Sequence, residues 1–513
     1  MIDLLWGIGG MVVILGLGWL LSVDRRRINL RTVSLALLVQ VVFAVLVLYV
    51  PAGQQVLSGL TNAVQAVIDS SRAGIDFLFG PILPEDGSVF AFQVLPVIVF
   101  FASLTAVLYY VGLLQLVTRW IGGALAKVLG TTRPESMNAA ANIFVGQTEA
   151  PLVIRPYIRT MSPSEVFAVM AGGLTTVAGS VLIGYSLLGA NLDYLIAASF
   201  MAAPAGLLFA KIIVPAGAVE EFAAPESRLQ PGSAAASPAA AAGQDRHATQ
   251  RADAGPATSA GTTPSGTDTP GGTGTPGGTG TAGGTGTAGA STPGARAGSG
   301  GWLSRTFRRG ARRGATQAGA AELARRAGGD PVDAEGDAPE DRPVNVIDAA
   351  SRGASDGLSL ALNVGAMLLA FISLVALLNL ILGAVGGLFG YDDLSIQQLL
   401  GYVFAPIMAA VGVPLAEAVP AGSFLGQKVV LNEFVAFSDF APRAEEFSVK
   451  TQAVVTFALT GFANLGSLAI LLGGLGGIAP NQRGVIARLG LRAIAAGTLG
   501  NLMSAAIAGI LIG

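Results

Sequence analysis

The chain has 513 residues, of which 52% are hydrophobic and 12% are charged, and its mean hydropathy is +0.62. Soluble globular domains carry about 25% charged residues, so an ordinary soluble protein is excluded and the chain is expected to lie mostly in lipid. A formal net charge of −2 gives no electrostatic reason to expect a nucleic-acid partner. The absence of cysteine excludes disulfides and thiolate metal sites, and the single histidine, His247, lies in a polar stretch that indicates a solvated side chain.

Apolar stretches of the length that crosses a bilayer, roughly 20 residues, recur along the chain between polar or basic connections. Segment 51–90 mixes apolar with small polar and charged residues and predicts an interfacial amphipathic helix. The segment that follows Arg119 and a helix near 393–416 are also expected at the membrane surface. The eight predicted transmembrane helices are 3–22, 33–50, 91–118, 164–188, 191–214, 356–388, 449–475 and 488–512.

A long insert at 216–342 is rich in Ala, Gly, Thr, Pro and Ser and contains the near-repeat TPGGTGTPGGTGTAGGTGTAG. Such a composition buries too little apolar surface to offset the entropy of ordering, so it predicts a disordered tether. Within it, five arginines between 305 and 313 stand beside Trp302 and Phe307. This run fits either a surface helix on anionic lipid or a solvated basic segment.

Basic residues cluster after every odd-numbered predicted span. Cytoplasmic connections carry the excess of Lys and Arg in membrane proteins. The pattern therefore predicts a multi-pass protein of the cell membrane with both termini outside and the insert in the cytoplasm. The clusters are Arg25, Arg26, Arg27 and Arg31; Arg119, Lys127 and Arg133; the arginines of the insert; and Arg483, Arg488 and Arg492.

Two apolar segments are too short and too interrupted to span: NIFVGQTEAPLVIRPYI (142–158) and FLGQKVVLNEFVAF (424–437). Irregular backbone at membrane depth is tolerated where protein or a wet cavity satisfies it, which predicts two re-entrant hairpins. A helix interrupted by small polar residues follows each hairpin, at 174–185 and at 460–474. The two copies are expected in opposite orientations, as in the inverted repeats of secondary transporters, whose substrate site lies near the bilayer midplane.

Each hairpin carries one glutamate, Glu149 in the first and Glu433 in the second. Carboxylates at membrane depth favour a functional role, although either could simply hold its hairpin through backbone N–H groups. Asn464 and Ser467 are three apart on one helix face, which fits a polar site or interhelical hydrogen bonding. A membrane hydrolase using the two glutamates as acid and base would lack a nucleophile or metal-ligand set, and the duplicated hairpins disfavour a channel or receptor.

At these residues the sequence resembles the concentrative nucleoside transporter family. The matching motifs are GQTEAPLVIRPY, TTVAGSVLIGY, AASFMAAPAGLLFAK, NVIDAASRGASDGL, ALNVGAMLLAFISLVALLN, LNEFVAF and GFANLGSLAILLGGLGGIAP, within about 90–215 and 343–513. The resemblance implies an all-α homotrimer whose protomers have eight transmembrane helices, two hairpins, interfacial helices and a transport domain moving against a scaffold. The implied division is N-terminal transmembrane helices and scaffold (1–118), a first transport-domain repeat (119–215), the insert (216–342), a scaffold helix (343–392) and a second transport-domain repeat (393–513).

The resemblance also implies the residues that hold the substrate. Those at the nucleobase end would be Gln147, Thr148, Glu149 and Val181. Those at the ribose end would be Glu433, Asn464 and Ser467, with Phe462 packed beside the nucleoside.

The family's sodium site maps onto the first hairpin and the broken helix after it, at Asn142, Val145, Thr176 and Val177. Position 176 is Thr where some relatives have Ser, which retains the hydroxyl. The expected function is therefore nucleoside import coupled to sodium by alternating access, with no enzymatic activity and no cofactor beyond the coupling ion. Glu149 and Glu433 leave proton coupling open, and a nucleobase or another polar metabolite is the alternative substrate.

Overall fold

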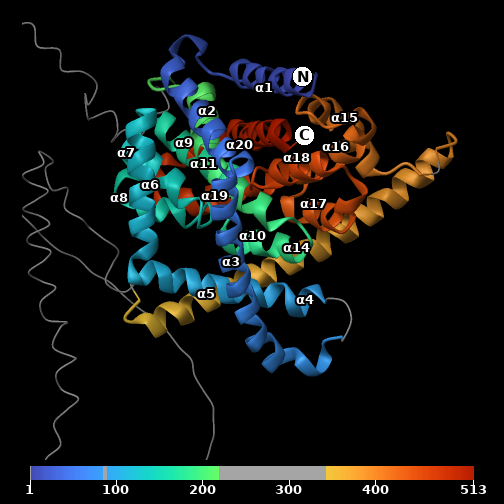
Figure 1. Cartoon of the computed structure of the whole chain (residues 1–513), viewed down its shortest axis with the longest axis horizontal. Helices are drawn as coiled ribbons and strands as arrows, with labels where there is room; N and C mark the ends of the chain where they lie inside the picture. Colours follow the sequence, from blue (N-terminus) through green and yellow to red (C-terminus); the bar gives the residue numbers. More distant parts are fainter. Residues whose placement is uncertain (1, 85–88, 219–342, 392, 513) are drawn as a thin grey trace, which may run out of the picture. The chain divides into compact units, whose positions relative to one another are not determined.

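The structure is a computed structural model that describes residues 2–84, 89–218, 343–391 and 393–512. These residues lie in one compact unit, and every regular element in them is a helix (Figure 1). The predicted all-α class is confirmed for this part of the chain. The near-repeat and the basic run of the predicted insert lie outside the described residues.

Within the described residues, six helices are long and apolar enough to cross a membrane, and they correspond to six of the eight predicted spans. A seventh would result if the bent pair α15 (Ile396–Ala410) and α16 (Leu415–Val430) were one span. The first predicted span corresponds to α1 (Ile2–Leu20), and the seventh to two shorter helices, α18 (Val449–Leu459) and α19 (Leu465–Ile478). The six are 30–49, 90–111, 163–187, 192–213, 346–387 and 480–512.

The third predicted span, 91–118, ends earlier than expected. After the short helix α4 (Phe90–Gln93), α5 (Leu95–Val111) stops at Gly112, whose φ of 88° lies in the left-handed region that glycine adopts without strain. A separate helix, α6 (Leu113–Leu129), follows and buries one face. The single span expected over 91–118 is therefore wrong in its second part, because the chain turns at this glycine.

Two other predicted elements are present with changed bounds. Over the predicted amphipathic segment 51–90, α3 (Pro51–Phe79) is one long helix that buries only Leu57, Ile68, Ser71 and Ile75. The last three have helical spacing, as expected for one apolar stripe. The sixth predicted span, 356–388, is instead α14 (Val346–Gly387), which begins where the Asn345 side chain accepts a hydrogen bond from the Asp348 N–H at 2.9 Å.

The buried core consists of α9 (Pro163–Thr175), α11 (Leu192–Ile213), α18 and α20 (Arg483–Ile512), which pack against one another. Figure 1 shows α20, in dark red, beside α11 and α18. In the apolar window of α11, 89% of residues are buried, against 6% in that of α14. The helices α1 and α2 (Leu30–Ala44) pack on this core, whereas α14 packs mainly on α5.

An order of paired short helices, broken helix and long helix occurs twice, and the paired short helices are named the first and second hairpin after the prediction. In the first copy the paired helices begin at Arg133, before the predicted start at 142. In the second copy they begin at Leu415, and the predicted segment 424–437 runs from α16 across the break at 431–432 into α17. The first copy comprises α7 (Arg133–Ala141), an irregular segment 142–149, a short helical turn Ala150–Ile154, α8 (Arg155–Ile158), α9, α10 (Gly179–Leu187) and α11. The second comprises α16, α17 (Glu433–Phe440), α18, α19 and α20.

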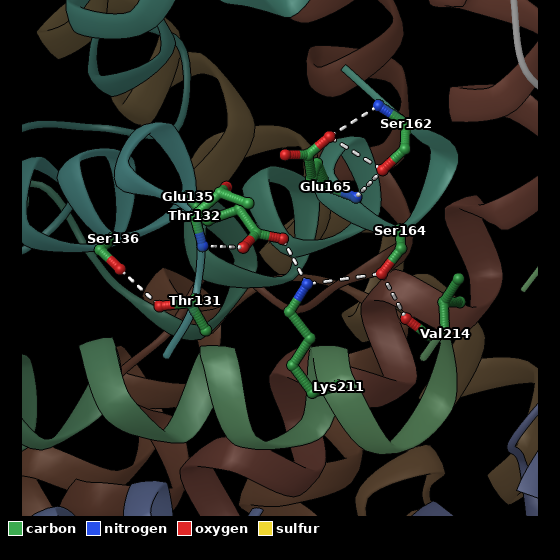
Figure 2. Close-up of polar contacts among 9 residues, drawn as sticks. All are labelled: Thr131, Thr132, Glu135, Ser136, Ser162, Ser164, Glu165, Lys211 and Val214. Carbon is green, nitrogen blue, oxygen red and sulfur yellow. Dashed lines mark hydrogen bonds and ion pairs between the residues drawn. The ribbon is translucent and has the colours of Figure 1, made fainter. Parts of the chain in front are cut away.

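A buried polar cluster attaches the first hairpin to the core (Figure 2). Glu135 closes a capping box at the start of α7 by accepting from the Thr132 N–H at 2.9 Å, and its other oxygen forms an ion pair with Lys211 of α11. The Lys211 ammonium also approaches Ser164 Oγ, which donates to the Val214 carbonyl at 2.8 Å. Because a buried carboxylate is costly without a partner, this pair fixes the hairpin base to α11 and α9.

Candidate functional site

The two helix breaks predicted from the sequence lie side by side. The first follows α9 at 176–178, and the second follows α18 at 460–464. The Phe462 N–H donates to the Thr176 carbonyl at 3.1 Å, which joins them directly. Unwound backbone of this kind exposes carbonyls and N–H groups that can bind ions and polar solutes, as in transporters with inverted repeats.

The irregular tip of the first hairpin contacts the first break. The Gly179 N–H donates to the Phe144 carbonyl at 3.1 Å. A Cβ placed on Gly173 of α9 would lie 2.9 Å from Gln147 Cβ, so only glycine allows this approach. The hairpin tip and the break therefore form one polar region.

The four predicted nucleobase residues lie on this tip and on α10. Gln147 is buried, and its Oε1 has no hydrogen-bond partner among the described residues. The Glu149 carboxylate accepts from the Gly146 N–H, yet the residue remains exposed. Thr148 lies against Gly474 of α19, and Val181 is buried in the first turn of α10. An unpartnered amide oxygen and an exposed carboxylate are groups that a heterocycle could bind.

Of the predicted ribose residues, Asn464 contacts the carboxylate of Glu433, which begins α17 and is 6% exposed. Asn464 Nδ2 donates to Glu433 Oε2 at 2.8 Å, and Tyr185 OH donates to Glu433 Oε1 at 3.1 Å. Half-buried Phe462 lies two residues before Asn464 in the second break. The structure thus brings together residues from α10, α17 and the break before α19.

The prediction that Asn464 and Ser467 lie on one helix face is wrong. Asn464 has extended backbone and caps α19, accepting the Ser467 N–H at 2.8 Å through its side-chain oxygen. Capping uses the amide oxygen and leaves the Nδ2 group free to reach Glu433. The sequence carried this signal, since Asn directly before an apolar helical run is a preferred N-cap.

Tyr185 is a functional candidate that the sequence analysis did not single out. It is fully buried, its ring stacks on Phe437 at 4.3 Å between centroids, and it meets Phe434 edge-on at 5.0 Å. Its hydroxyl is one of two donors that hold Glu433. The motif TTVAGSVLIGY contains it, but only the fold shows that its hydroxyl faces a carboxylate 248 positions away.

The predicted cation residues lie where α7 ends beside the break after α9. Asn142 caps the end of α7 and is completely buried; its Nδ2 donates to the Asn138 carbonyl at 3.0 Å, while its Oδ1 has no partner among the described residues. Thr176 and Val177 are buried in the break. Val145 lies in the hairpin tip three residues after Asn142.

This arrangement offers oxygen atoms that carry no formal charge. The carbonyl end of a half-helix, here that of α9, carries partial negative charge that favours a cation. Among the described residues, no three His, Asp or Glu side chains cluster as a metal site. A hard monovalent cation therefore fits these groups better than a divalent metal, which prefers carboxylates.

Comparisons with known families decide the identity of the fold. Residues 9–82 match a family described as the N-terminus of Na+ dependent nucleoside transporters, residues 91–191 match one described as nucleoside recognition, and residues 322–509 match the C-terminus of Na+ dependent nucleoside transporters. The nucleoside permease NupC of Helicobacter pylori is 38% identical over 99% of this chain and 98% of its own. The chain belongs to the concentrative nucleoside transporter family. It is a membrane transporter rather than an enzyme.

Other members of the concentrative nucleoside transporter family are similar over nearly the whole chain. Sodium/nucleoside cotransporter 1 of Sus scrofa is 30% identical, over 98% of this chain and 63% of that protein. Two solved structures of CNTnw are each 42% identical to this chain, with a TM-score of 0.74. The match to an inward-facing substrate-bound state covers 99% of this chain and 98% of that one. The match to a doubly substituted variant in an outward-facing state covers 100% of this chain and 98% of that one.

Proposed function

We propose that this chain is a sodium-coupled symporter that imports nucleosides by alternating access. One observation carries the proposal: the buried, unpartnered Asn142 Oδ1 lies beside the broken end of α9, and this break is joined to the one that presents Asn464 to Glu433. A cation at the first break and a polar solute at the second would then bind adjacent parts of one structure. The relatives named as nucleoside permease and sodium/nucleoside cotransporter support this pairing.

In this proposal the nucleoside lies across both hairpins. Its ribose hydroxyls bind Glu433, Asn464 and Ser467, because a carboxylate accepts hydroxyl protons strongly and an amide can donate or accept. Its base faces the first hairpin, where Gln147 has an unused acceptor. The complete proposed set is Gln147, Thr148, Glu149 and Val181 at the base, and Glu433, Phe462, Asn464 and Ser467 at the sugar.

Sodium is proposed to bind the Asn142 side chain and Thr176, with Val145 and Val177 supplying backbone carbonyls. These ligands are oxygens without formal charge, and the carbonyl end of a half-helix favours a cation. The ion would tie the hairpin tip to the first break. It would thereby order the surface to which the base binds, so ion and nucleoside would favour each other.

We also propose the membrane arrangement that the family resemblance implies: a homotrimer of protomers with eight spans, two re-entrant hairpins, external termini and a cytoplasmic insert. The chain bends by 117° between α15 and α16, which would let α16 enter the membrane from a surface along which α15 would lie. Large apolar side chains of α14, including Leu362, Leu369 and Leu380, are exposed. They suit contact with lipid or with another subunit.

The test is radiolabelled uridine uptake into proteoliposomes that contain the full chain. We expect uptake to follow an inward sodium gradient and to be inhibited by unlabelled nucleosides more strongly than by free nucleobases. Uptake that did not respond to the sodium gradient and followed a pH gradient would show that the coupling ion is the proton and not sodium. Equal competition by uracil and uridine would overturn the assignment of Glu433, Asn464 and Ser467 to the ribose.

A further inference from the structure

Lys428, on the first arm of the second hairpin, is completely buried in α16. Lys211, the other buried lysine of the described residues, pairs with a carboxylate. The Lys428 ammonium instead donates to two oxygens without formal charge, the Ala458 carbonyl at 2.7 Å and Asn501 Oδ1 at 2.8 Å. Burying an ammonium is costly, so a lysine held in this way calls for an explanation beyond packing.

The orientation of the Asn501 amide follows from its partners. An ammonium can only donate, and a backbone carbonyl can only accept. Oδ1 must therefore face Lys428, while Nδ2 donates to the Thr175 carbonyl at 2.7 Å and to the Thr460 carbonyl at 2.6 Å. Through this single amide, Lys428 holds the carbonyl ends of both half-helices, α9 and α18.

The position of this ammonium corresponds to that of the proposed sodium site. In the first repeat the cation ligands are Asn142, at the end of the first hairpin arm, and Thr176, just after α9. In the second repeat Lys428 lies in the last turn of the first hairpin arm, and Ala458 in the last turn of α18. Both positions lie at the C-terminal end of a half-helix, where exposed carbonyls favour positive charge.

We propose that Lys428 is a tethered cation, built into the second repeat at the place that sodium takes in the first. It is a positioning residue, because it holds the break that presents Phe462 and Asn464 and does not itself touch the substrate. The second break then carries its cation permanently, whereas the cation of the first break is the mobile ion. This comparison rests on the proposed sodium coupling, but the ammonium and its contacts do not.

The first test measures uridine uptake against sodium concentration in proteoliposomes. The variants are Lys428→Ala, Lys428→Met and, as a matched control, Lys127→Ala at an exposed position of α6. We expect both Lys428 variants to lose about tenfold or more in uptake at the sodium concentration that saturates wild type, because a charged donor to two carbonyl-type oxygens is lost. In Lys428→Ala the vacated space should admit a second sodium, so its sodium dependence should be steeper than that of wild type.

Ethylammonium chloride provides a rescue experiment, because its cation resembles the end of the missing side chain. It should restore uptake by Lys428→Ala but not by Lys428→Met, whose side chain still fills the space, and it should leave Lys127→Ala unchanged. Wild-type sodium dependence and wild-type uridine affinity in both Lys428 variants, without any response to ethylammonium, would overturn the proposal.

A second readout separates this proposal from the proposed transport function. Ethylammonium should raise the melting temperature of purified Lys428→Ala more than that of wild type or Lys127→Ala, whether or not nucleosides are transported. Lys428→Arg serves if Lys428→Ala does not fold: it retains the charge, so its sodium dependence should be as steep as that of wild type even if uptake is weaker. A steeper dependence in Lys428→Arg, or no selective thermal shift in folded Lys428→Ala, would contradict the tethered cation.

Discussion

Glu433 illustrates how one side chain can serve both the fold and the substrate. Its two oxygens already accept from Tyr185 OH and Asn464 Nδ2, so the carboxylate is held in place before any ligand arrives. A carboxylate has about four acceptor positions, which leaves room for hydroxyl donors from a sugar. Preorganised acceptors of this kind bind a polar solute without first having to be ordered.

We predict that Glu433→Gln weakens nucleoside binding by about 10- to 100-fold, which corresponds to the roughly 1.5–3 kcal/mol of a hydrogen bond to a charged group. The neutral amide also offers only one acceptor oxygen, so Tyr185 and Asn464 could no longer each donate to a separate oxygen. Calorimetric titration of the purified protein measures the change. The control is Glu417→Gln. Glu417 lies in the first turn of α16, where its carboxylate accepts a hydrogen bond from Ser448, and this variant should bind nucleoside as wild type does. Wild-type affinity in Glu433→Gln would refute the ribose assignment.

For the cation we predict that Asn142→Ala raises the sodium concentration for half-maximal uptake by about tenfold, the equivalent of roughly 1.4 kcal/mol. The buried Oδ1 has no protein partner in the described residues, so its removal should affect the ion more than the fold. Asn29→Ala is the control: it deletes the cap of α2, costs about 1 kcal/mol in stability and should leave the sodium dependence unchanged. An unaltered sodium curve in Asn142→Ala would remove Asn142 from the proposed site.

At the scale of elements, the sequence predicted the two interrupted segments and the broken helix after each, because interrupted apolar segments and small polar residues are local features. It also held signals for the start of the first hairpin, since TRPE at 132–135 has the spacing of a capping box. The contacts of Lys428 could not be predicted from the sequence, because its partners Ala458 and Asn501 lie 30 and 73 positions away. Such pairings follow from how the two repeats pack, and no local pattern encodes them.

The ion pair at the base of the first hairpin should be essential to its attachment. Lys211→Met leaves Glu135 buried without a counter-charge, and we predict a loss of about 3–5 kcal/mol in stability. The double variant Glu135→Leu with Lys211→Met should recover most of that loss. Arg72→Met, which removes an exposed pair with Asp69, should cost about 0–1 kcal/mol. Melting temperatures in detergent rank the variants, and a Lys211→Met protein as stable as wild type would contradict the prediction.

The close approach of the two breaks depends on Gly461. A Cβ at this position would overlap Asn501 Oδ1 and lie 2.7 Å from the Thr175 carbonyl. We predict that Gly461→Ala destabilises the protein by about 1–3 kcal/mol, as overpacked sites do, and sharply reduces nucleoside uptake. Gly473→Ala is the matched control on α19, where an added Cβ meets nothing within 4 Å. If both variants melt and transport as wild type does, the junction tolerates displacement and the proposed coupling through it loses its support.

At the scale of the whole molecule, the junction of the two breaks should couple the ion to the substrate. The Phe462 N–H binds the Thr176 carbonyl, and Asn501 binds the carbonyls of Thr175 and Thr460, so ordering one break favours order in the other. We predict that sodium tightens nucleoside binding by about 5- to 150-fold, the usual range for coupled sites, and that nucleoside tightens sodium binding by the same factor. Calorimetric titrations of each ligand with and without the other measure both factors. Asn501→Ala should reduce the two coupling factors equally. Independent binding of sodium and nucleoside in wild type would show that the two breaks are not energetically coupled.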